Sequence, residues 1–350
     1  MSIRTRLLYA AAFALAMSSV AARAETMDEL YDKAKAEKSL TIYAGGPVAG
    51  YEPLAREFEK KYPGLEVKIE GGFSNVLNEK IDKQFSAGKL ETDLVFFQTA
   101  QDFVRWKGQG RLLSFRPEGT DVIPASFRDP DNTFIAWYVA TLGYAYNTNH
   151  VRPEHAPQSG LDFLKPEFRG KLITCYPFDD DATLYLFHTL MQKYGDDYLD
   201  KYIANKPNWI QGHLGVVRSV AAGNDFATFD ASTATTLGAK RGGQPVEYVF
   251  SEIDPVPIFY STAGIFKDAP HPNMAKLYLT WILQPEQQRR IGTYSPRPDV
   301  PPPSPQLKPL ADMKLANNYR EFVTNEPLLK SLRKKFEDAI GPIKNAGGVR

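Results

Sequence analysis

The sequence predicts an α/β protein built from two lobes, and two observations support this prediction. Three strand–turn–helix units follow one another between residues 40 and 107, and a similar succession returns after residue 159. Alternating strands and helices are typical of a parallel sheet covered by helices. A chain of 350 residues is long enough for two domains rather than one.

The first 24 residues have the pattern of a secretory signal peptide. Arg4 and Arg6 precede the apolar run 7–20, and Ala22-Arg23-Ala24 has the A-x-A form of a cleavage site. The apolar run is too short to span a bilayer as a helix, which makes a membrane anchor the weaker alternative. We therefore predict cleavage after Ala24 and a secreted protein, located in the periplasm if the host is Gram-negative.

The charge argues against a nucleic-acid-binding protein, and the cysteine content argues against a fold held by disulfides. The formal charge is +1 for the whole chain, and loss of three arginines with residues 1–24 leaves a slightly acidic protein of mixed charge. Such a chain is not expected to bind nucleic acid. Cys175 is the single cysteine, so no intramolecular disulfide can form, and its apolar surroundings predict a buried strand residue.

The first block begins with a capping box, Thr26 to Glu29, that predicts a helix running to about residue 38. Three strands are then expected at 40–44, 65–70 and 93–97. Each strand ends in a small polar turn, and the helices expected after these turns cover 51–62, 76–85 and 100–107. The stretch 117–132 is rich in Pro, Asp and Gly and predicts a surface loop.

The second block predicts strands at 171–175, 225–229 and 246–250 and helices at 182–194, 216–222 and 234–240. Asp179-Asp180-Asp181 is expected as one strand-end turn and Asp230-Ala231-Ser232-Thr233 as another. Two long β-rich runs, 134–147 and 255–265, precede and follow this block. The chain then predicts helices at 274–283 and 326–340, separated by an irregular, proline-rich stretch at 293–305.

No sequence motif of catalysis is present. The chain has no G-x-S-x-G, P-loop, G-x-G-x-x-G, H-E-x-x-H or C-x-x-C pattern. His150 and His155 flank a proline-rich turn and are expected to be exposed, while His188 is expected to pack within a helix. The aspartates of the turn 179–181 lack the spacing of a calcium loop, and both a helix-capping role and a ligand contact stay open for them.

The polar turns at the strand ends are the candidate binding site. They contain Gly46, Ser74, Asn75 and Gln98 in the first block, with Asp181 and Ser232 in the second. Helix N-termini favour an anionic group, whereas the aspartates favour an amine or a metal. We therefore expect a solute with an anionic group and a positive or hydroxyl-rich part.

Several segments resemble the family 1 extracellular solute-binding proteins of ABC importers, closest to the ferric-iron, phosphonate and organic-anion branch. They are LTIYAGG, DLVFFQ, LGYAYNTN, FLKPEFRGKL and TAGIFKDAPHPNMAKLYLTWILQPEQQ. The resemblance implies a type II periplasmic binding protein fold, in which two lobes joined by a two-crossing hinge close on a solute. The crossings would be the runs 137–147 and 255–265. Lobe 1 would then comprise 25–145 and 256–350, and lobe 2 would comprise 146–255.

The resemblance further implies a monomeric receptor, without enzymatic activity or cofactor, that delivers a small solute to membrane permease subunits. The favoured solute is a carboxylate, phosphonate or phosphate ester. Tyr260, on the second crossing, joins the turn residues as a candidate contact. Arg297 is a candidate counter-charge or a surface residue, and Trp137 and Tyr138 are expected to pack in the core rather than stack on a ligand.

Two alternatives remain at this point. Ferric-binding members carry adjacent tyrosines after the strand that matches 225–229, where this chain reads Phe229-Asp230-Ala231-Ser232. The missing phenolates disfavour iron, although Asp180, Asp181 and Asp230 keep it open because hard cations prefer anionic oxygen ligands. A secreted α/β hydrolase that uses Asp180 or Asp230 as a base is the second alternative, but the sequence shows no partner group for either.

Overall fold

The computed structural model describes residues 24–344. The predicted signal peptide lies outside this range except for Ala24. Within the described range, no helix is long and apolar enough to cross a membrane. The first helix, α1 (Met27–Glu37), begins with the expected capping box, in which the Glu29 amide donates to Thr26 Oγ1 over 3.3 Å and the Thr26 amide donates to Glu29 Oε2 over 2.8 Å.

The three strand–turn–helix units of the first block are confirmed. Their elements are β1 (Ser39–Gly45), α2 (Glu52–Lys61), β2 (Glu66–Gly72), α3 (Ser74–Ser86), β3 (Leu94–Phe97) and α4 (Ala100–Gly108). Strand β1 lies between β2 and β3 and pairs in parallel with both. Because parallel strands point the same way, their carboxyl ends and the turns that follow them share one edge of the sheet.

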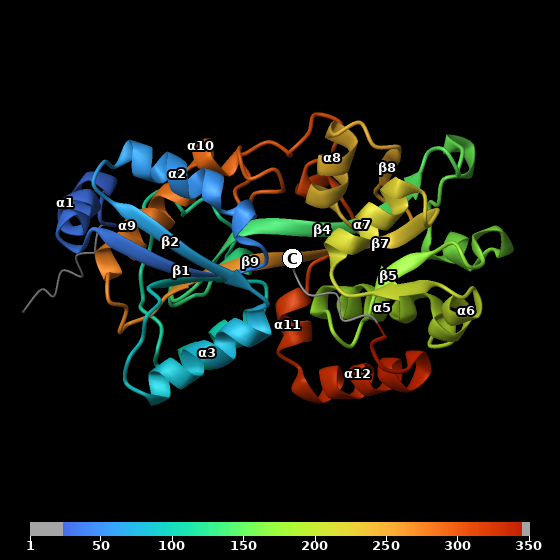
Figure 1. Ribbon diagram of the computed structural model, residues 1–350, viewed down its shortest axis with the longest axis horizontal. Coiled ribbons are helices and arrows are strands. Elements are labelled where there is room, and N and C mark those ends of the chain that lie inside the picture. The colour runs from blue at the N-terminus through green and yellow to red at the C-terminus, as the bar shows by residue number, and fades with distance from the viewer. Residues whose placement is uncertain (1–23, 345–350) are drawn as a thin grey trace, which may run out of the picture.

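Two long strands connect the lobes. Strand β4 (Ile135–Asn147) and strand β9 (Val256–Ile265) pair antiparallel, with Tyr138 opposite Ser261 and Thr141 opposite Ile258. Each strand has one end in the core of the first lobe and the other in the core of the second. Figure 1 shows both strands running across the middle of the molecule. The two-lobe, two-crossing architecture is therefore present.

The second block adds four strands and four helices to the described chain. They are β5 (Ile173–Cys175), α5 (Asp181–Tyr194), α6 (Tyr198–Ala204), β6 (Asn208–Ile210), α7 (His213–Ala222), β7 (Ala227–Ser232), α8 (Thr233–Arg241) and β8 (Val246–Val249). Strands β5 and β6 form a parallel pair, whereas β7 and β8 pair antiparallel with β4. Single turns of 3-10 helix occur in the connections: η1 (Val48–Gly50), η2 (Ala125–Phe127), η3 (Pro153–His155), η4 (Gly160–Leu164), η5 (Pro166–Phe168) and η6 (Leu310–Asp312).

One boundary in this block differs from the prediction. Asp230, expected in a turn, lies inside β7 and is fully buried. The strand extends past it because the pairing of β7 with β4 continues to Ser232, opposite Leu142. Local sequence gave no sign of this, since a buried aspartate needs partners that come from elsewhere in the chain.

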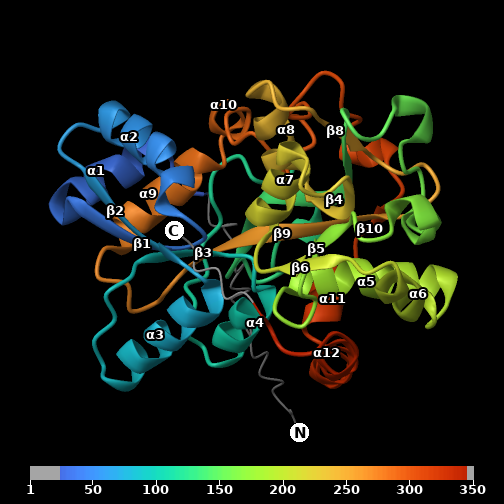
Figure 2. The same ribbon diagram turned by 45° about the vertical axis from the view of Figure 1, so that its right-hand side comes forward.

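The last elements are α9 (Pro272–Ile282), α10 (Pro285–Gln288), β10 (Leu315–Ala316), α11 (Tyr319–Val323) and α12 (Glu326–Ile340). Helix α9 packs against α1 at one end of the molecule. Helix α12 instead lies beside α5, as Figures 1 and 2 both show, and the rings of Phe336 and Phe187 are 5.0 Å apart. The chain therefore returns to the second block after completing the first.

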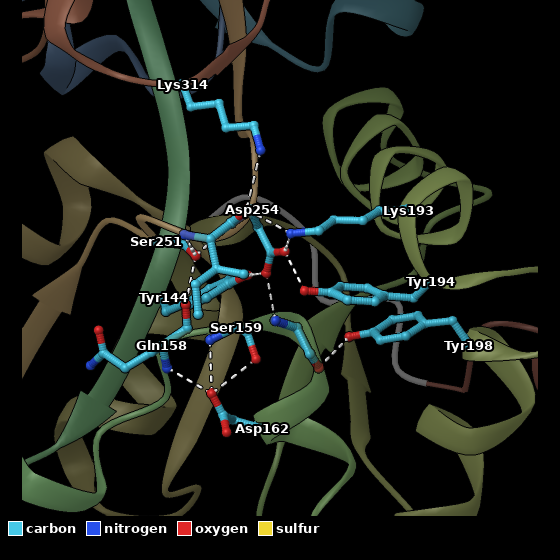
Figure 3. Close-up of polar contacts among 12 residues, drawn as sticks. Tyr144, Gln158, Ser159, Asp162, Lys193, Tyr194, Tyr198, Ser251, Asp254 and Lys314 are labelled. Atoms are coloured by element: carbon cyan, nitrogen blue, oxygen red, sulfur yellow. Dashed lines mark hydrogen bonds and ion pairs between the residues drawn. The ribbon is translucent and has the colours of Figure 1, made fainter.

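A buried aspartate holds the entry to β9 in place (Figure 3). The Asp254 carboxylate accepts hydrogen bonds from Tyr144 on β4 (2.5 Å), from the Gly160 amide (2.6 Å), and from Lys193 (2.5 Å) and Tyr194 on α5. Burial would raise the pKa of this carboxyl group, but the bonds from Lys193 and the tyrosines outweigh burial and lower it. Asp254 thus ties the second hinge strand to the second block.

Candidate functional site

The turns after β1 and β2 lie against each other, as the sequence predicted for strand ends on one sheet edge. Gly46 has φ of 101°, which favours glycine, and its amide donates to the Gly72 carbonyl over 2.8 Å. A Cβ atom on Gly45 would lie 2.6 Å from Ser74 Oγ. Ser74 is buried at the start of α3, and Asn75 beside it is exposed.

The turns after β1, β2 and β3 form one side of the candidate site, which we call the first wall. The turn after β3 is the last of the three. Gln98 is half-buried, and Thr99 is the N-cap residue of α4 without making a side-chain capping bond. The Oγ1 atom of Thr99 is buried and has no hydrogen-bond partner among the described residues. This turn therefore offers a hydroxyl group that the protein itself does not use.

The opposite side of the candidate site, the second wall, is formed by the starts of α5 and α8. A side-chain contact joins it to the first wall. Gln101 on α4 donates from Nε2 to Asp181 Oδ2 over 2.9 Å, which brings the N-termini of α4 and α5 together. Asp181 also pairs with Arg333 of α12, with Nη2 and Oδ1 separated by 2.5 Å. Since its side chain is only 11% exposed, the carboxylate of Asp181 is engaged by the protein.

The turn after β7 supplies the other side of the second wall. Ser232 is the N-cap residue of α8, is half-buried, and makes no side-chain capping bond. Next to it, the Thr233 hydroxyl contacts the Thr141 hydroxyl on β4 and lies 2.9 Å from the Tyr248 hydroxyl. The hydrogen bond to Thr141 places the start of α8 directly beside the hinge.

The helices that begin at these turns differ in how their N-termini are satisfied. Within the described residues, no side chain caps α3, α4 or α8. Only α5 is capped, because Asp180 accepts from the amides of Ala182 and Thr183. Such N-termini carry partial positive charge and attract anions, although the Ala100 and Asp102 amides of α4 already donate to the carbonyls of Gln98 and Thr99.

Tyr260 is not brought together with these turns. Its hydroxyl accepts a hydrogen bond from Arg320 Nε over 2.9 Å, and its ring packs against Phe127 and Tyr319. It lines a separate cavity that also contains Arg297. Tyr260 lies on the hinge strand, and the side-chain direction that decides its neighbours could not be read from the sequence.

Arg297 is a buried structural residue rather than a surface residue. Its guanidinium donates from Nε and Nη2 to both oxygens of Asp299, and from Nη1 to the Gly119 carbonyl over 2.6 Å.

Trp137 is buried against Phe96, as expected for a core residue, and donates from Nε1 to Ser261.

A charged network of His213, Asp180 and Asp230 lies behind the second wall, and the sequence did not predict it. His213, the first residue of α7, lies with Nε2 3.0 Å from Asp230 Oδ1 and with Nδ1 3.4 Å from Asp180 Oδ2. Burial would lower the pKa of His213, but the carboxylates of Asp180 and Asp230 outweigh burial and raise it to about 9. The predicted helix started at residue 216, which left His213 without an assigned place.

One possible metal-ligand atom from each of Cys175, His213 and Asp230 lies within 4.8 Å of the others, which is close enough for a metal site. Asp230 already accepts from the Cys175 amide and from the hydroxyls of Thr174 and Thr183. Burial also raises the pKa of the Cys175 thiol, which opposes the thiolate that a metal needs. The donor set therefore fits an internal hydrogen-bond network, not a metal centre.

Comparison with known proteins identifies the family to which this protein belongs. Residues 44–289 match the family described as bacterial extracellular solute-binding protein, which is most of the chain, and the protein belongs to that family. The probable ABC transporter periplasmic-binding protein y4fP of Sinorhizobium fredii is 21% identical over 175 residues, covering 47% of this chain. The match spans about half the length of that curated relative, 48%.

Solved structures establish the fold. Iron-bound HitA from Pseudomonas aeruginosa superposes with a TM-score of 0.72 at 19% identity, covering 85% of this chain and 99% of that one. The periplasmic binding protein AfuA from Actinobacillus pleuropneumoniae, with fructose-6-phosphate bound, gives a TM-score of 0.71 at 21% identity, covering 87% and 100%. The type II periplasmic binding protein fold expected from the sequence is confirmed.

Proposed function

We propose that this protein is the periplasmic receptor of an ABC importer and that it captures a small anionic organic solute between its lobes. The solute is a carboxylate, phosphonate or phosphate ester. The contacts would come from Gly46, Ser74, Asn75 and Gln98 in one wall and from Ser232 in the other. Asp181 and Tyr260, also expected as contacts, have protein partners in the described structure.

The observation that carries this proposal is the set of uncapped helix N-termini in both walls, at α3, α4 and α8. Free amides at helix N-termini stabilise negative charge without a charged side chain. An anionic group placed there would satisfy donors that the protein leaves open. Closure of the lobes would bring the two walls onto the solute, and the closed receptor would then deliver it to permease subunits.

Ferric iron is the second candidate ligand, because iron-bound HitA has a similar fold. The available oxygen ligands argue against it. Asp230 has no exposed surface and Asp181 is paired with Arg333. Tyr248 contacts Thr233 at the α8 turn, and burial raises the pKa of Tyr248, which opposes phenolate formation. A hard trivalent ion would therefore lack the anionic oxygens that it prefers.

A hydrolytic enzyme has less support than a binding protein. Asp230 and His213 do form a carboxylate–imidazole pair, which the sequence did not reveal. However, Asp230 is fully buried, and the hydroxyls that contact the pair belong to the buried Thr174 and Thr183. General acid–base catalysis requires groups that can reach a substrate. We expect no turnover of chromogenic esters, phosphates or glycosides, and turnover that is lost in Asp230→Asn would contradict the binding role.

The test is a thermal-shift screen of the mature protein against carboxylates, phosphonates, sugar phosphates, amines and ferric salts. A ligand at a hundredfold excess over its Kd should raise the free energy of unfolding by about 3 kcal/mol. Shifts confined to ferric salts would replace the anion proposal with iron. Once a ligand is found, Ser232→Asp tests the site directly.

In the Ser232→Asp variant, the new carboxylate should cap α8 and repel a bound anion. We expect the affinity to fall at least tenfold while the free protein keeps or gains up to about 1 kcal/mol of stability. The matched control is Ser331→Asp on the exposed face of α12, which adds the same charge elsewhere. Equal affinities of Ser232→Asp and Ser331→Asp would place the anion away from α8.

A further inference from the structure

A second cavity lies beside the hinge strand β9 and has no part in the proposed capture of an anion. Its volume is about 270 Å³, and Ile258 and Tyr260 of β9 form one wall. The opposite walls come from three loop segments, around residues 124–127, 294–302 and 309–317. None of the strand-end turns of the candidate anion site contributes to its lining.

The walls of this cavity are apolar and stiff. Five prolines line it, together with Phe127, Tyr294, Val300 and Leu310. Proline has no N–H group and a fixed φ angle, so these walls offer few donors and change shape little when a ligand enters. A cavity of this kind favours a rigid, apolar molecule over a flexible or hydrated one.

The one cation in the cavity lining is not free to bind an anion. Arg297 is the only charged residue in the lining. Its three nitrogens are used by Asp299, by the Gly119 carbonyl and by the Leu283 carbonyl, 3.3 Å from Nη1. Arg320 is not in the lining, and its guanidinium already donates to the Tyr260 hydroxyl and the Ser126 carbonyl behind the wall, so an anion in this cavity would contact no cation with a free donor.

The hydroxyl of Tyr260 is a polar group of the cavity that can still donate a hydrogen bond. The Tyr260 hydroxyl accepts from Arg320 Nε, and no described residue accepts the tyrosine proton. Arg320 is itself held by the Ser126 carbonyl, at 2.9 Å from Nη2, which fixes the position of the tyrosine oxygen. The Tyr260 O–H group can thus donate one hydrogen bond to a molecule in the cavity.

We propose that this cavity binds a neutral, aromatic small molecule that carries one hydrogen-bond acceptor. The ring would lie between the proline walls and the rings of Phe127 and Tyr294, and the acceptor oxygen would take the hydrogen bond from Tyr260. The volume suits a molecule of about two fused rings, because an engineered apolar cavity of roughly 150 Å³ holds benzene. The ligand would rest on the hinge strand, away from the anion site.

Isothermal titration calorimetry of the mature protein tests this with a matched pair of probes, 2-acetylnaphthalene and 2-naphthoate. The two have the same rings, but the first is neutral and the second is an anion. We expect saturable one-to-one binding of 2-acetylnaphthalene and at least tenfold weaker binding of 2-naphthoate. Tyr260→Phe should weaken 2-acetylnaphthalene several-fold and leave naphthalene, which has no acceptor, unchanged.

Cavity-filling variants locate the binding. Leu310→Trp should lower the affinity for 2-acetylnaphthalene at least tenfold, and Leu161→Trp, at a position that is 47% exposed outside the cavity, should leave it within twofold. Ala311→Trp, from the exposed rim of the cavity, gives the same test if Leu310→Trp does not fold. Absence of saturable binding, equal binding of both probes, or wild-type affinity in the Trp variants would overturn the proposal.

Discussion

At the scale of single residues, the polar groups behind the site are set by their partners and not by their local sequence. His213 lies between Asp180 and Asp230 although 33 and 17 positions separate it from them in the chain. Asp230 is fully buried and accepts hydrogen bonds from β5 and α5 as well. Such a network holds four elements, β5, α5, α7 and β7, together at the base of the second wall.

The raised pKa of His213 makes the stability of the protein depend on pH. An imidazole has a pKa near 6.5 when unfolded, and the folded value is about 9. The stabilisation is therefore complete below about pH 6.5 and is lost as the pH rises towards 9. We expect the free energy of unfolding from urea titrations to fall over this range, by an amount on the order of 2 kcal/mol.

The control for this prediction separates His213 from other histidines. His213→Gln should flatten the pH dependence between 6.5 and 9, because its side chain does not titrate. His155→Gln, at an exposed loop position, should retain the slope of the wild type. Parallel curves for His213→Gln and the wild type would show that the imidazole is not charged in the native state.

At the scale of elements, the first wall depends on close approach of two strand ends. A Cβ atom on Gly71 would lie 2.5 Å from the Gly46 carbonyl oxygen and 2.9 Å from Val48 Cγ2. The carbonyl belongs to the backbone, so the turn after β1 would have to move. Glycine is needed here for space rather than for an unusual φ angle.

Gly71→Ala should therefore lower the free energy of unfolding by about 1–3 kcal/mol, the usual cost of overpacking. It should also weaken the anion ligand, because the turn that contains Gly46 is displaced. Urea denaturation and calorimetry measure the two effects. Gly50→Ala is the matched control, since no atom lies within 4 Å of its added methyl group, and it should be neutral or slightly stabilising. Equal stability of the two variants would contradict this account.

At the scale of the whole molecule, the C-terminal helix contributes to the core of the second block. Leu329, Leu332 and Phe336 form the buried face of α12, and the salt bridge from Arg333 reaches Asp181 at the start of α5. The α5 helix in turn contacts α4 through Asp181 and Gln101. Helix α12 is thus connected to both walls of the candidate site.

Phe336→Ala should destabilise the protein by about 3–5 kcal/mol, as expected for removal of a buried phenylalanine. Its ring is fully buried and lies 5.0 Å from the ring of Phe187. Chemical denaturation followed by circular dichroism measures the loss. Lys334→Ala on the same helix, at a side chain that is 74% exposed, should change stability by no more than about 0.5 kcal/mol. A loss below about 1 kcal/mol for Phe336→Ala would mean that α12 packs only loosely.

The sequence by itself determined most of the longer elements, their order and the family, but it did not predict the short elements α6, β6, β10 and α11. Periodicity and capping residues act over a few neighbouring positions, which is why the three units of the first block and the bounds of α12 were predicted closely. The turns with Gly46 and Ser74 were brought together as expected, because parallel strands end on one edge.

Only the tertiary structure decided which polar residues are free. Asp181, Asp230 and Arg297 look available in the sequence, yet each is engaged by partners, and Tyr260 lines a different cavity. The physical reason is that burial and hydrogen bonding depend on contacts between segments far apart in the chain, which local patterns do not contain.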